Sequence, residues 1–345
     1  MKMTTTTCSL KQVAAAADVS TMTVSRVMRN SPLVGRGTRA RVLAIAEKMG
    51  YRPDPVASRL MAVVRKGKGR KNTTAIALIR DRRGRPPADG DVHRYVHQED
   101  VLHRAERHGY AVSEFLLGEG GLTVGRLQSI LKARGIEGVL FSLETSREWV
   151  EGFDFSRYAS ATFGYGLQAP ALHRASTNMM QGLLSAFLRL EKLGYERIGL
   201  AITPWVNDRS DQTYSGAMLN YQTSQPKRRR IPPLIFRTNN LSENKQAFCQ
   251  WARLHRPDAV ISFDRLVPDW IGKTLGRRIP EDIGFVVHDW TERTAGYSGI
   301  SHNRNHVVMA AVDMVTTQLY HSEIGVPEVP RQVLIPATWI EGKSC

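Results

Sequence analysis

The chain has 345 residues, 42% hydrophobic and 23% charged, which predicts two or three globular domains and excludes a disordered or collagen-like protein. Three scattered cysteines, no apolar run of about 18 residues and no apolar leader argue against a disulfide scaffold, a membrane span and a secretory signal, and favour the cytoplasm. The net charge of +16 is concentrated at the start, because residues 1–71 hold 15 Lys/Arg and 3 Asp/Glu, whereas the other 274 residues hold 33 and 29. A short basic domain on a nearly neutral body is typical of a nucleic-acid-binding module.

Three short helices are predicted at the N-terminus, over Leu10–Ala17, Thr21 to about Arg29, and about Thr38 to Met49. Ser9 and Gln12 have the spacing of a capping box, and Ser20 is a second N-cap. Asp18 falls in the tight turn between helices, where a positive φ is needed, and Gly50 follows the third helix. The side chains expected inside are Leu10, Val13, Ala14, Ala17, Val24, Val27, Met28, Val42, Ile45, Ala46 and Met49.

After this segment, Asp54 and Pro55 can start a short helix through Leu60 or Met61, and the basic, glycine-broken residues 65–71 read as a linker. From residue 74 onward, apolar strands alternate with amphipathic helices, which predicts parallel sheets in two doubly wound lobes. The predicted strands are 75–79, 111–117, 138–141, 159–163, 198–202, 234–237, 259–263 and 284–288. The predicted helices are 101–108, 124–134, 180–193, 243–254, 269–275 and 307–320.

The helical segment carries a specific series of residues: Val13-Ala14-x-x-Ala17-Asp18-Val19-Ser20-x-x-Thr23-Val24-Ser25-Arg26-Val27, then Thr38-Arg39-x-x-Val42, Gly50-Tyr51-Arg52-Pro53-Asp54 and Val56-Ala57-x-x-Leu60. It resembles the helix-turn-helix of the lactose/galactose repressor (LacI/GalR) family. Looser matches in the body include His108-Gly109-Tyr110, Leu193–Ile198, Pro257–Val260 and Ile279–Ile283, so the resemblance spans nearly the whole chain. It implies a helix-turn-helix headpiece with a hinge helix, followed by a two-lobed core like that of periplasmic binding proteins.

The start of a second helix, held by a first helix lying across it, can reach base edges in the major groove. Thr21, Met22 and Arg26 lie on one side of that helix, where Arg26 can pair bidentately with a guanine and the other two suit a thymine methyl or a shape contact. Contacts to phosphate, which fix register, are predicted for Ser20, Ser25, Thr38, Arg39 and Arg52. An alanine-rich helical domain with merely solvated arginines is the alternative.

The resemblance implies that the 54–61 helix enters the minor groove as a pair, with Leu60 as a wedge. The hinge residues so implicated are Asp54, Val56, Ala57 and Leu60. The alternative is a helical linker with Leu60 buried against the body. The chain departs from the family pattern at Arg29 and Gly35, and at Asp54, which places a carboxylate near DNA.

For the core, the resemblance implies a ligand between the lobes. Asp264 matches a family aspartate that binds ligand hydroxyls, whereas the usual arginine is replaced by Thr213, for which Arg209 can substitute. Asp289 and Trp290 follow a predicted strand at a sheet edge, and Trp290 or Trp205 can stack on a sugar. A purely structural role is as well supported for each of these residues.

Three further sequence patterns are interpreted as structural features without a specific function. His93 and His97 are spaced as a metal pair without a third ligand, and we interpret them as a solvated helix face. Gly118–Gly121 lacks the spacing of a phosphate loop and predicts a plain loop. The run Lys227–Arg230 predicts an exposed solvated loop, with auxiliary DNA contact as the alternative.

These features predict a DNA-binding transcription regulator, a repressor acting as a homodimer on a palindromic DNA operator and responding to a small polar effector. No enzymatic activity, metal or cofactor is expected. The predicted domains are 1–53 for DNA binding, 54–72 for hinge and linker, and 73–345 for the core, with one lobe at 73–175 and 292–328 and the other at 176–291 and 329–343. The alternatives are an architectural DNA binder without an effector and a small-molecule-binding protein merely tethered to nucleic acid.

Overall fold

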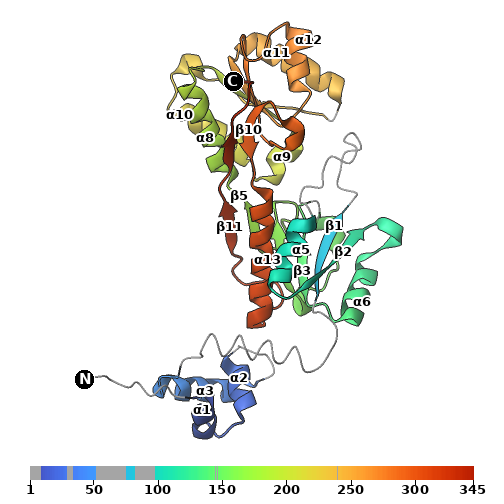
Figure 1. The fold of residues 1–345 in the computed structure, drawn as a ribbon, viewed down its shortest axis with the longest axis vertical. Helices are drawn as coiled ribbons and strands as arrows, with labels where there is room; N and C mark the ends of the chain where they lie inside the picture. Colours follow the sequence, from blue (N-terminus) through green and yellow to red (C-terminus); the bar gives the residue numbers. More distant parts are fainter. Residues whose placement is uncertain are drawn as a thin grey trace, which may run out of the picture.

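The fold was obtained as a computed structural model that describes residues 9–28, 34–51, 75–81, 98–143, 145, 147–238 and 240–345 (Figure 1). Arg52 and the hinge residues Asp54, Val56, Ala57 and Leu60 lie outside the described residues, as do Arg29, His93 and His97. The predictions made for these residues therefore remain predictions.

The N-terminal headpiece consists of three helices, α1 (Leu10–Ala16), α2 (Thr21–Met28) and α3 (Arg36–Lys48), as the sequence predicts. The capping box of Ser9 and Gln12 is present, and the hydroxyl of Ser20 accepts a hydrogen bond from the Thr23 N–H at 3.1 Å. Asp18 and Gly50 have positive φ angles of 49° and 62°, so both helix ends turn as expected. Local capping chemistry is enough to place these helices.

The headpiece core is small and apolar. Val13, Val24 and Val42, one from each helix, are fully buried and meet in a single cluster with Ala14, Ala17, Val27 and Ala46. The predicted burial of Met49 is wrong, because this residue is the C-cap of α3 and remains 36% exposed. About 40 residues thus enclose a core of their own.

The first lobe of the core is a six-stranded, wholly parallel sheet with the order β11-β5-β4-β3-β1-β2. Its strands are β1 (Ala75–Asp81), β2 (Ala111–Leu117), β3 (Gly138–Phe141), β4 (Ala159–Phe163), β5 (His173–Thr177) and β11 (Gln332–Ile335). Its helices are α5 (Gln98–Arg107), α6 (Val124–Arg134), α7 (Arg147–Val150) and α13 (Arg304–His321). The long helix α13 packs on β3, β4 and β5 although it comes late in the chain.

The second lobe repeats this topology, with the order β12-β10-β9-β8-β6-β7, and only β12 runs antiparallel to its neighbour. Its strands are β6 (Ile198–Ile202), β7 (Leu234–Ile235), β8 (Ala259–Ser262), β9 (Gly284–Val287), β10 (Ser298–Ser301) and β12 (Thr338–Ile340). Its helices are α8 (Met179–Lys192), α9 (Pro204–Arg209), α10 (Thr213–Thr223), α11 (Leu241–His255) and α12 (Val267–Leu275). Two doubly wound lobes are therefore present, as predicted.

The predicted lobe boundaries need two corrections. Strand β10 at 298–301 lies in the second sheet, not the first, and β11 at 332–335 lies in the first sheet, not the second. The sequence analysis also missed β5, β10, β11 and β12, together with α7, α9 and α10. The four strands are short, and polar residues interrupt the apolar run in two of them: β5 contains histidine, arginine, serine and threonine, and β10 contains two serines.

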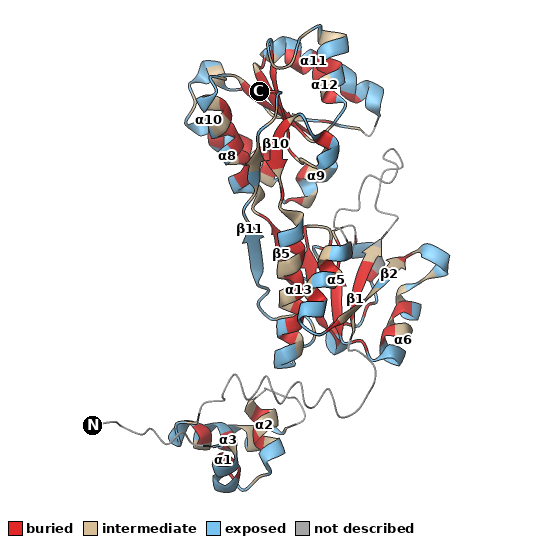
Figure 2. Ribbon diagram, in the orientation of Figure 1, coloured by how far each residue is buried: buried red, intermediate tan, exposed pale blue. Residues whose placement is uncertain are grey.

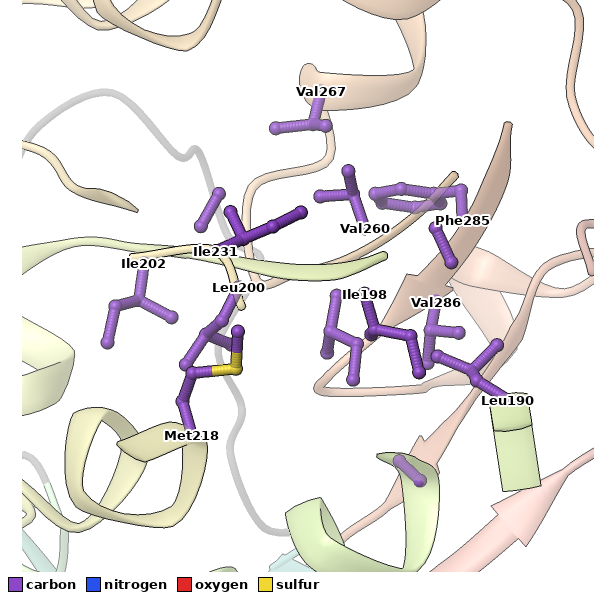
Figure 3. Packing of buried hydrophobic residues seen from close by; sticks show 14 of the residues in the cluster. Leu190, Ile198, Leu200, Ile202, Met218, Ile231, Val260, Val267, Phe285 and Val286 are labelled. Atoms are coloured by element: carbon purple, nitrogen blue, oxygen red, sulfur yellow. The ribbon is translucent and has the colours of Figure 1, made fainter. Parts of the chain in front are cut away.

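Each sheet is buried on both faces (Figure 2), which explains why the central strands read as continuous apolar runs. In the second lobe, Leu200 of β6 lies beside Met218 of α10, and Val286 of β9 lies beside Leu190 of α8, whereas Val260 of β8 and Phe285 of β9 lie on the other face of the sheet with Val267 of α12 (Figure 3). Gly199 is required here, because a Cβ at this position would lie 2.3 Å from the Trp251 ring. The packing fixes the strand ends that carry the polar side chains described next.

The chain crosses between the lobes three times, after β5, after β10 and after β11. Hydrogen bonds tie the crossings together: the Thr177 hydroxyl donates to the His302 carbonyl at 2.8 Å, and the Asn303 side-chain amide donates to the Pro336 carbonyl at 2.8 Å. The Asn178 N–H donates to the Ile335 carbonyl, also at 2.8 Å. The carboxyl ends of both sheets consequently face one another across this hinge.

Candidate DNA-binding surface and effector site

The exposed side of α2 carries the residues predicted to read bases. Val24 and Val27 are buried in the headpiece, helix periodicity places Met22 and Arg26 on the opposite side, and Thr21 is exposed at the first position of the helix. Met22 is 60% exposed, so its apolar side chain can reach a thymine methyl. The geometry permits the predicted groove contacts.

The predicted phosphate contacts flank this helix. Ser20 lies at the N-terminal end of α2, where its hydroxyl accepts the Thr23 N–H and where the helix dipole favours an anion, and Ser25 is half-buried one turn on. Thr38 and Arg39 lie in the first turn of α3, which begins at Arg36, two residues earlier than predicted. Because of that offset, the sequence analysis missed Arg36, an exposed guanidinium in the same turn.

Polar residues of the core gather where strands of the two sheets end. In each sheet the strand order reverses between the first and third strands, β1 and β3 in one lobe and β6 and β8 in the other, and such reversals are the usual ligand sites of α/β sheets. Asp264 follows β8 and Asp289 follows β9, whereas Trp205 and Arg209 lie on α9 after β6. The structure thus brings the predicted effector residues to one sheet edge.

Asp264 is half-buried at this edge. Its Oδ1 accepts a hydrogen bond from the Leu266 N–H at 2.8 Å, and its own N–H donates to the Ser262 hydroxyl at 3.1 Å. These bonds hold the loop between β8 and α12 in a fixed turn. The carboxylate is accordingly preorganised, which favours recognition of a hydroxyl-bearing ligand.

Asp289 has a charged partner from the first lobe. The Arg304 guanidinium, at the start of α13, donates to its Oδ2, and both side chains are 18% exposed. Its Oδ1 has no hydrogen-bond partner among the described residues and lies 3.8 Å from Nδ1 of His302. One oxygen of this carboxylate is engaged by Arg304 of the first lobe, and the other is buried beside the His302 ring.

Arg209 forms a bridge between the lobes. Its guanidinium donates to the Leu143 carbonyl after β3 and stacks over the Trp205 ring, with Cζ 4.3 Å from the ring centroid. The Gln168 amide donates to the Arg209 carbonyl at 3.2 Å and to Asp211 at 3.3 Å. Trp205 is 49% exposed, so a ligand can stack only on the ring area that Arg209 leaves open.

The two predicted tryptophans differ in setting. The Trp290 side chain packs on β10, because a Cβ at Gly299 would lie 2.8 Å from the Trp290 Cβ, and the backbone N–H of Trp290 donates to the Ile300 carbonyl at 2.9 Å. Thr213 begins α10, where its hydroxyl donates to the Ser210 carbonyl. Both sets of contacts favour a structural role for Trp290 and Thr213.

Two buried histidines at this edge were missed by the sequence analysis. Nε2 of His302 lies 3.3 Å from Nδ1 of His288, and the His288 ring packs edge-on against Tyr214 with centroids 4.5 Å apart. Burial, and then the neighbouring His302, hold the pKa of His288 well below its usual value. Burial also lowers the pKa of His302, although Asp289 opposes this effect. Only the fold could reveal this pair, since the residues are 14 positions apart in sequence.

The histidine pair predicts that the core loses stability on acidification. Because both pKa values are lower in the folded state, the unfolded chain binds more protons below about pH 6.5, the ordinary histidine pKa, and stability falls as the pH decreases. Each histidine that stays neutral contributes a slope approaching about 1.4 kcal/mol per pH unit. Urea denaturation between pH 7.5 and 5.5 measures this slope.

The control for this prediction is His288→Phe, which suits the aromatic surroundings and removes one titrating ring. We expect the stability of this variant to depend less steeply on pH than that of the wild type. Equal slopes for the two proteins would contradict the assignment.

The structure describes two of the three weaker sequence patterns. Gly118–Gly121 forms a loop with a short 3₁₀ turn, and Lys227–Arg230 is a largely exposed turn, as predicted. In the part of the chain that the structure describes, no group of three or more His, Cys, Asp or Glu side chains could hold a metal ion. Over the same residues, no helix has the length and apolar character needed to cross a membrane.

Comparison with known proteins supports both parts of the molecule. Residues 9–54 match the family model "Bacterial regulatory proteins, lacI family". The sucrose operon repressor of Escherichia coli is 45% identical over 73 residues, which cover 21% of this chain and 20% of that protein. The regulator reg1 of Streptomyces lividans is 28% identical over 211 residues, 57% of this chain and 54% of the relative. The matched segment thus spans about a fifth of the sucrose operon repressor and about half of reg1.

Solved structures extend the likeness to the whole fold. The lac repressor bound to ONPG superposes with a TM-score of 0.57 at 18% identity and covers 98% of this chain and 100% of that one. A CelR–cellobiose complex gives the same score and identity over the same shares of both chains. At this identity the match establishes the architecture of the core.

The molecule combines a helix-turn-helix headpiece with a two-lobed core of the periplasmic-binding-protein type. This combination is that of a DNA-binding transcription regulator. Residues 9–54 thus carry the helix-turn-helix of the lacI family of bacterial regulatory proteins, and the whole chain shares the fold of the lac repressor.

Proposed function

We propose that the protein is a transcriptional repressor that binds a palindromic operator as a homodimer, in the bacterial cytoplasm, and is modulated by a small polar effector held between the core lobes. The observation that carries this proposal is the headpiece, in which a capped, exposed α2 presents Thr21, Met22 and Arg26 away from the core. The family assignment places the chain among regulators and not among enzymes.

Selection of bound sequences from random DNA by the full-length protein tests the DNA-binding part of the proposal. We expect enrichment of a single site with two-fold symmetry, because two identical headpieces read two half-sites. Enrichment without symmetry would contradict the dimer. Uniform, salt-sensitive binding without enrichment would favour the alternative of a core that is merely tethered to nucleic acid.

The effector is proposed to bind at the facing carboxyl ends of the two sheets, with Asp264 and Asp289 as hydrogen-bond acceptors. Two carboxylates at one edge fit a ligand rich in hydroxyl groups, such as a sugar. The Arg304 guanidinium holds Asp289 from the other lobe, so binding there is coupled to the hinge.

We expect that a panel of mono- and disaccharides contains at least one that raises the melting temperature and changes operator affinity. For that sugar, Asp264→Ala should weaken binding by about 1.5–3 kcal/mol, roughly 10- to 150-fold, because a charge-assisted hydrogen bond is lost. Titration calorimetry gives the affinity, and operator binding in the absence of sugar should remain unchanged.

Asp269→Ala is the matched control, because Asp269 is an exposed aspartate of the same lobe that pairs with Lys273 on its own helix. Wild-type sugar affinity in Asp264→Ala would exclude Asp264 from the site. A panel that produces no thermal shift would favour a DNA binder without a sugar effector.

A further inference from the structure

The core carries its excess positive charge on one surface. We define the distal loops as residues 191–197, 224–233, 253–258 and 276–283, which precede β6, β7, β8 and β9. They contain ten Lys/Arg and five Asp/Glu, a net charge of +5, whereas residues 72–345 as a whole have a net charge of +4. The rest of the core is therefore almost neutral, at −1.

Hydrogen bonds join the distal loops into one continuous surface. The Arg197 guanidinium donates to the carbonyls of Arg228, His255 and Arg256, the last at 3.2 Å. Arg277 continues the surface by donating to the Pro257 carbonyl at 3.3 Å. Arg197 is thus a structural residue that holds the basic turn against the end of α11.

The acidic residues of this surface are mostly engaged internally. The Asp258 carboxylate accepts the N–H groups of Glu196 and Arg197 at 2.8 and 2.9 Å, and Asp282 accepts the Arg278 N–H at 2.8 Å. Glu196 also pairs with Arg229. By contrast, four exposed or largely exposed cations pair with no carboxylate of the described residues: Lys227, Arg228, Arg253 and Arg256.

We propose that the distal loops bind the phosphate backbone of a second DNA duplex, distinct from the operator. The distal loops lie at the amino ends of the strands of the second sheet. Residue 75, the first described residue after the headpiece, starts β1 and so lies at the amino ends of the strands of the first sheet. A duplex on the distal loops therefore approaches the core from the end opposite to the one where the headpiece joins. The protein then bridges two segments of DNA.

Duplex DNA is favoured over an acidic protein by the chemistry of the cations. Three of the four are arginines, whose planar forks match phosphate oxygens, and Arg197 fixes the backbone that carries two of them. The proposal rests on the proposed function in one respect. A protein that is already bound to its operator meets a second segment of DNA at a high local concentration, which favours bridging. A protein partner would instead use Leu254, which is 75% exposed beside the arginines.

The test is a bridging assay with the full-length protein. The protein is saturated with excess operator duplex, immobilised through that duplex, and exposed to a labelled 40-base-pair duplex that lacks the operator. We expect capture of the labelled duplex at 50 mM salt, with strong loss by 200 mM, since counterions are released on phosphate binding. The triple variant Lys227→Gln/Arg228→Gln/Arg253→Gln should reduce capture at least tenfold while operator binding stays within twofold.

The matched control removes two arginines and one lysine from exposed positions of the first lobe, as Arg107→Gln/Arg126→Gln/Lys132→Gln, and should leave capture intact. Equal capture by both triple variants, or no capture by the wild type while it holds the operator, would overturn the proposal. Loss of capture in Leu254→Ala as large as in the distal triple variant would also overturn it, in favour of an apolar protein-binding surface. Failure to bind the operator at all would instead refute the proposed function.

Discussion

Arg26→Ala is expected to reduce operator affinity by about 1–3 kcal/mol for each headpiece, because a bidentate arginine–guanine contact is lost. A dimer uses two headpieces, so the loss is about 2–6 kcal/mol, or roughly 30-fold to 10⁴-fold in dissociation constant. Arg26 lies on the exposed side of α2, and the buried Val24 and Val27 hold the helix from behind. The variant should therefore fold normally.

The discriminating measurement compares operator with random duplex in the same fluorescence titration. Arg26→Ala should lose affinity for the operator alone, whereas Arg36→Ala, the matched arginine at the start of α3, should weaken binding to both duplexes alike. Equal losses of Arg26→Ala on the two duplexes would show that Arg26 contacts phosphate and reads no base.

Raising the salt concentration from about 50 to 200 mM should weaken operator binding by about 10³-fold to 10⁵-fold, as for a protein that contacts 6–10 phosphates. The described part of the headpiece carries six cations, Lys11, Arg26, Arg36, Arg39, Arg41 and Lys48, and a dimer presents them twice. Each released counterion contributes about −0.9 to the slope of log affinity against log salt.

The same titration with Arg36→Ala provides the internal standard. Two lost contacts per dimer should make the slope less steep by about 1.8. A nearly flat dependence of the wild type would rule out a binding mode dominated by the phosphate backbone, and an unchanged slope in Arg36→Ala would remove that residue from the interface.

The headpiece could be predicted almost completely from sequence because its determinants are local. Ser9, Ser20 and Asp18 fix helix ends through bonds to residues at most three positions away, or through their own φ angle. Apolar periodicity then identifies the buried face of each helix. The central strands were predictable for a similar reason, since a strand buried on both faces is a continuous apolar run.

The effector site was predictable only in part. Strand endings placed Asp264 and Asp289 at one sheet edge, but the partner of Asp289 is Arg304, 15 residues away and in the other lobe. The contact of Arg209 with the Leu143 carbonyl joins residues 66 positions apart, and the sequence around neither residue predicts it. The edge strand β11 was missed for another reason, because it is only four residues long and is mostly exposed, so it lacks the long buried run that identifies a central strand.

The late return of the chain to the first lobe sets the order in which this protein can fold during its synthesis. The first lobe needs α13, whose Val308, Ala311 and Val312 are fully buried against its sheet, and the second lobe needs β12, which follows β11. Neither sheet can be completed until most of the chain has left the ribosome. The headpiece, by contrast, has all of its core residues once residue 51 has been synthesised. During synthesis the headpiece can therefore fold while both core sheets are still incomplete. A chain truncated before residue 304 would have a folded headpiece and a core that cannot bury its apolar strands.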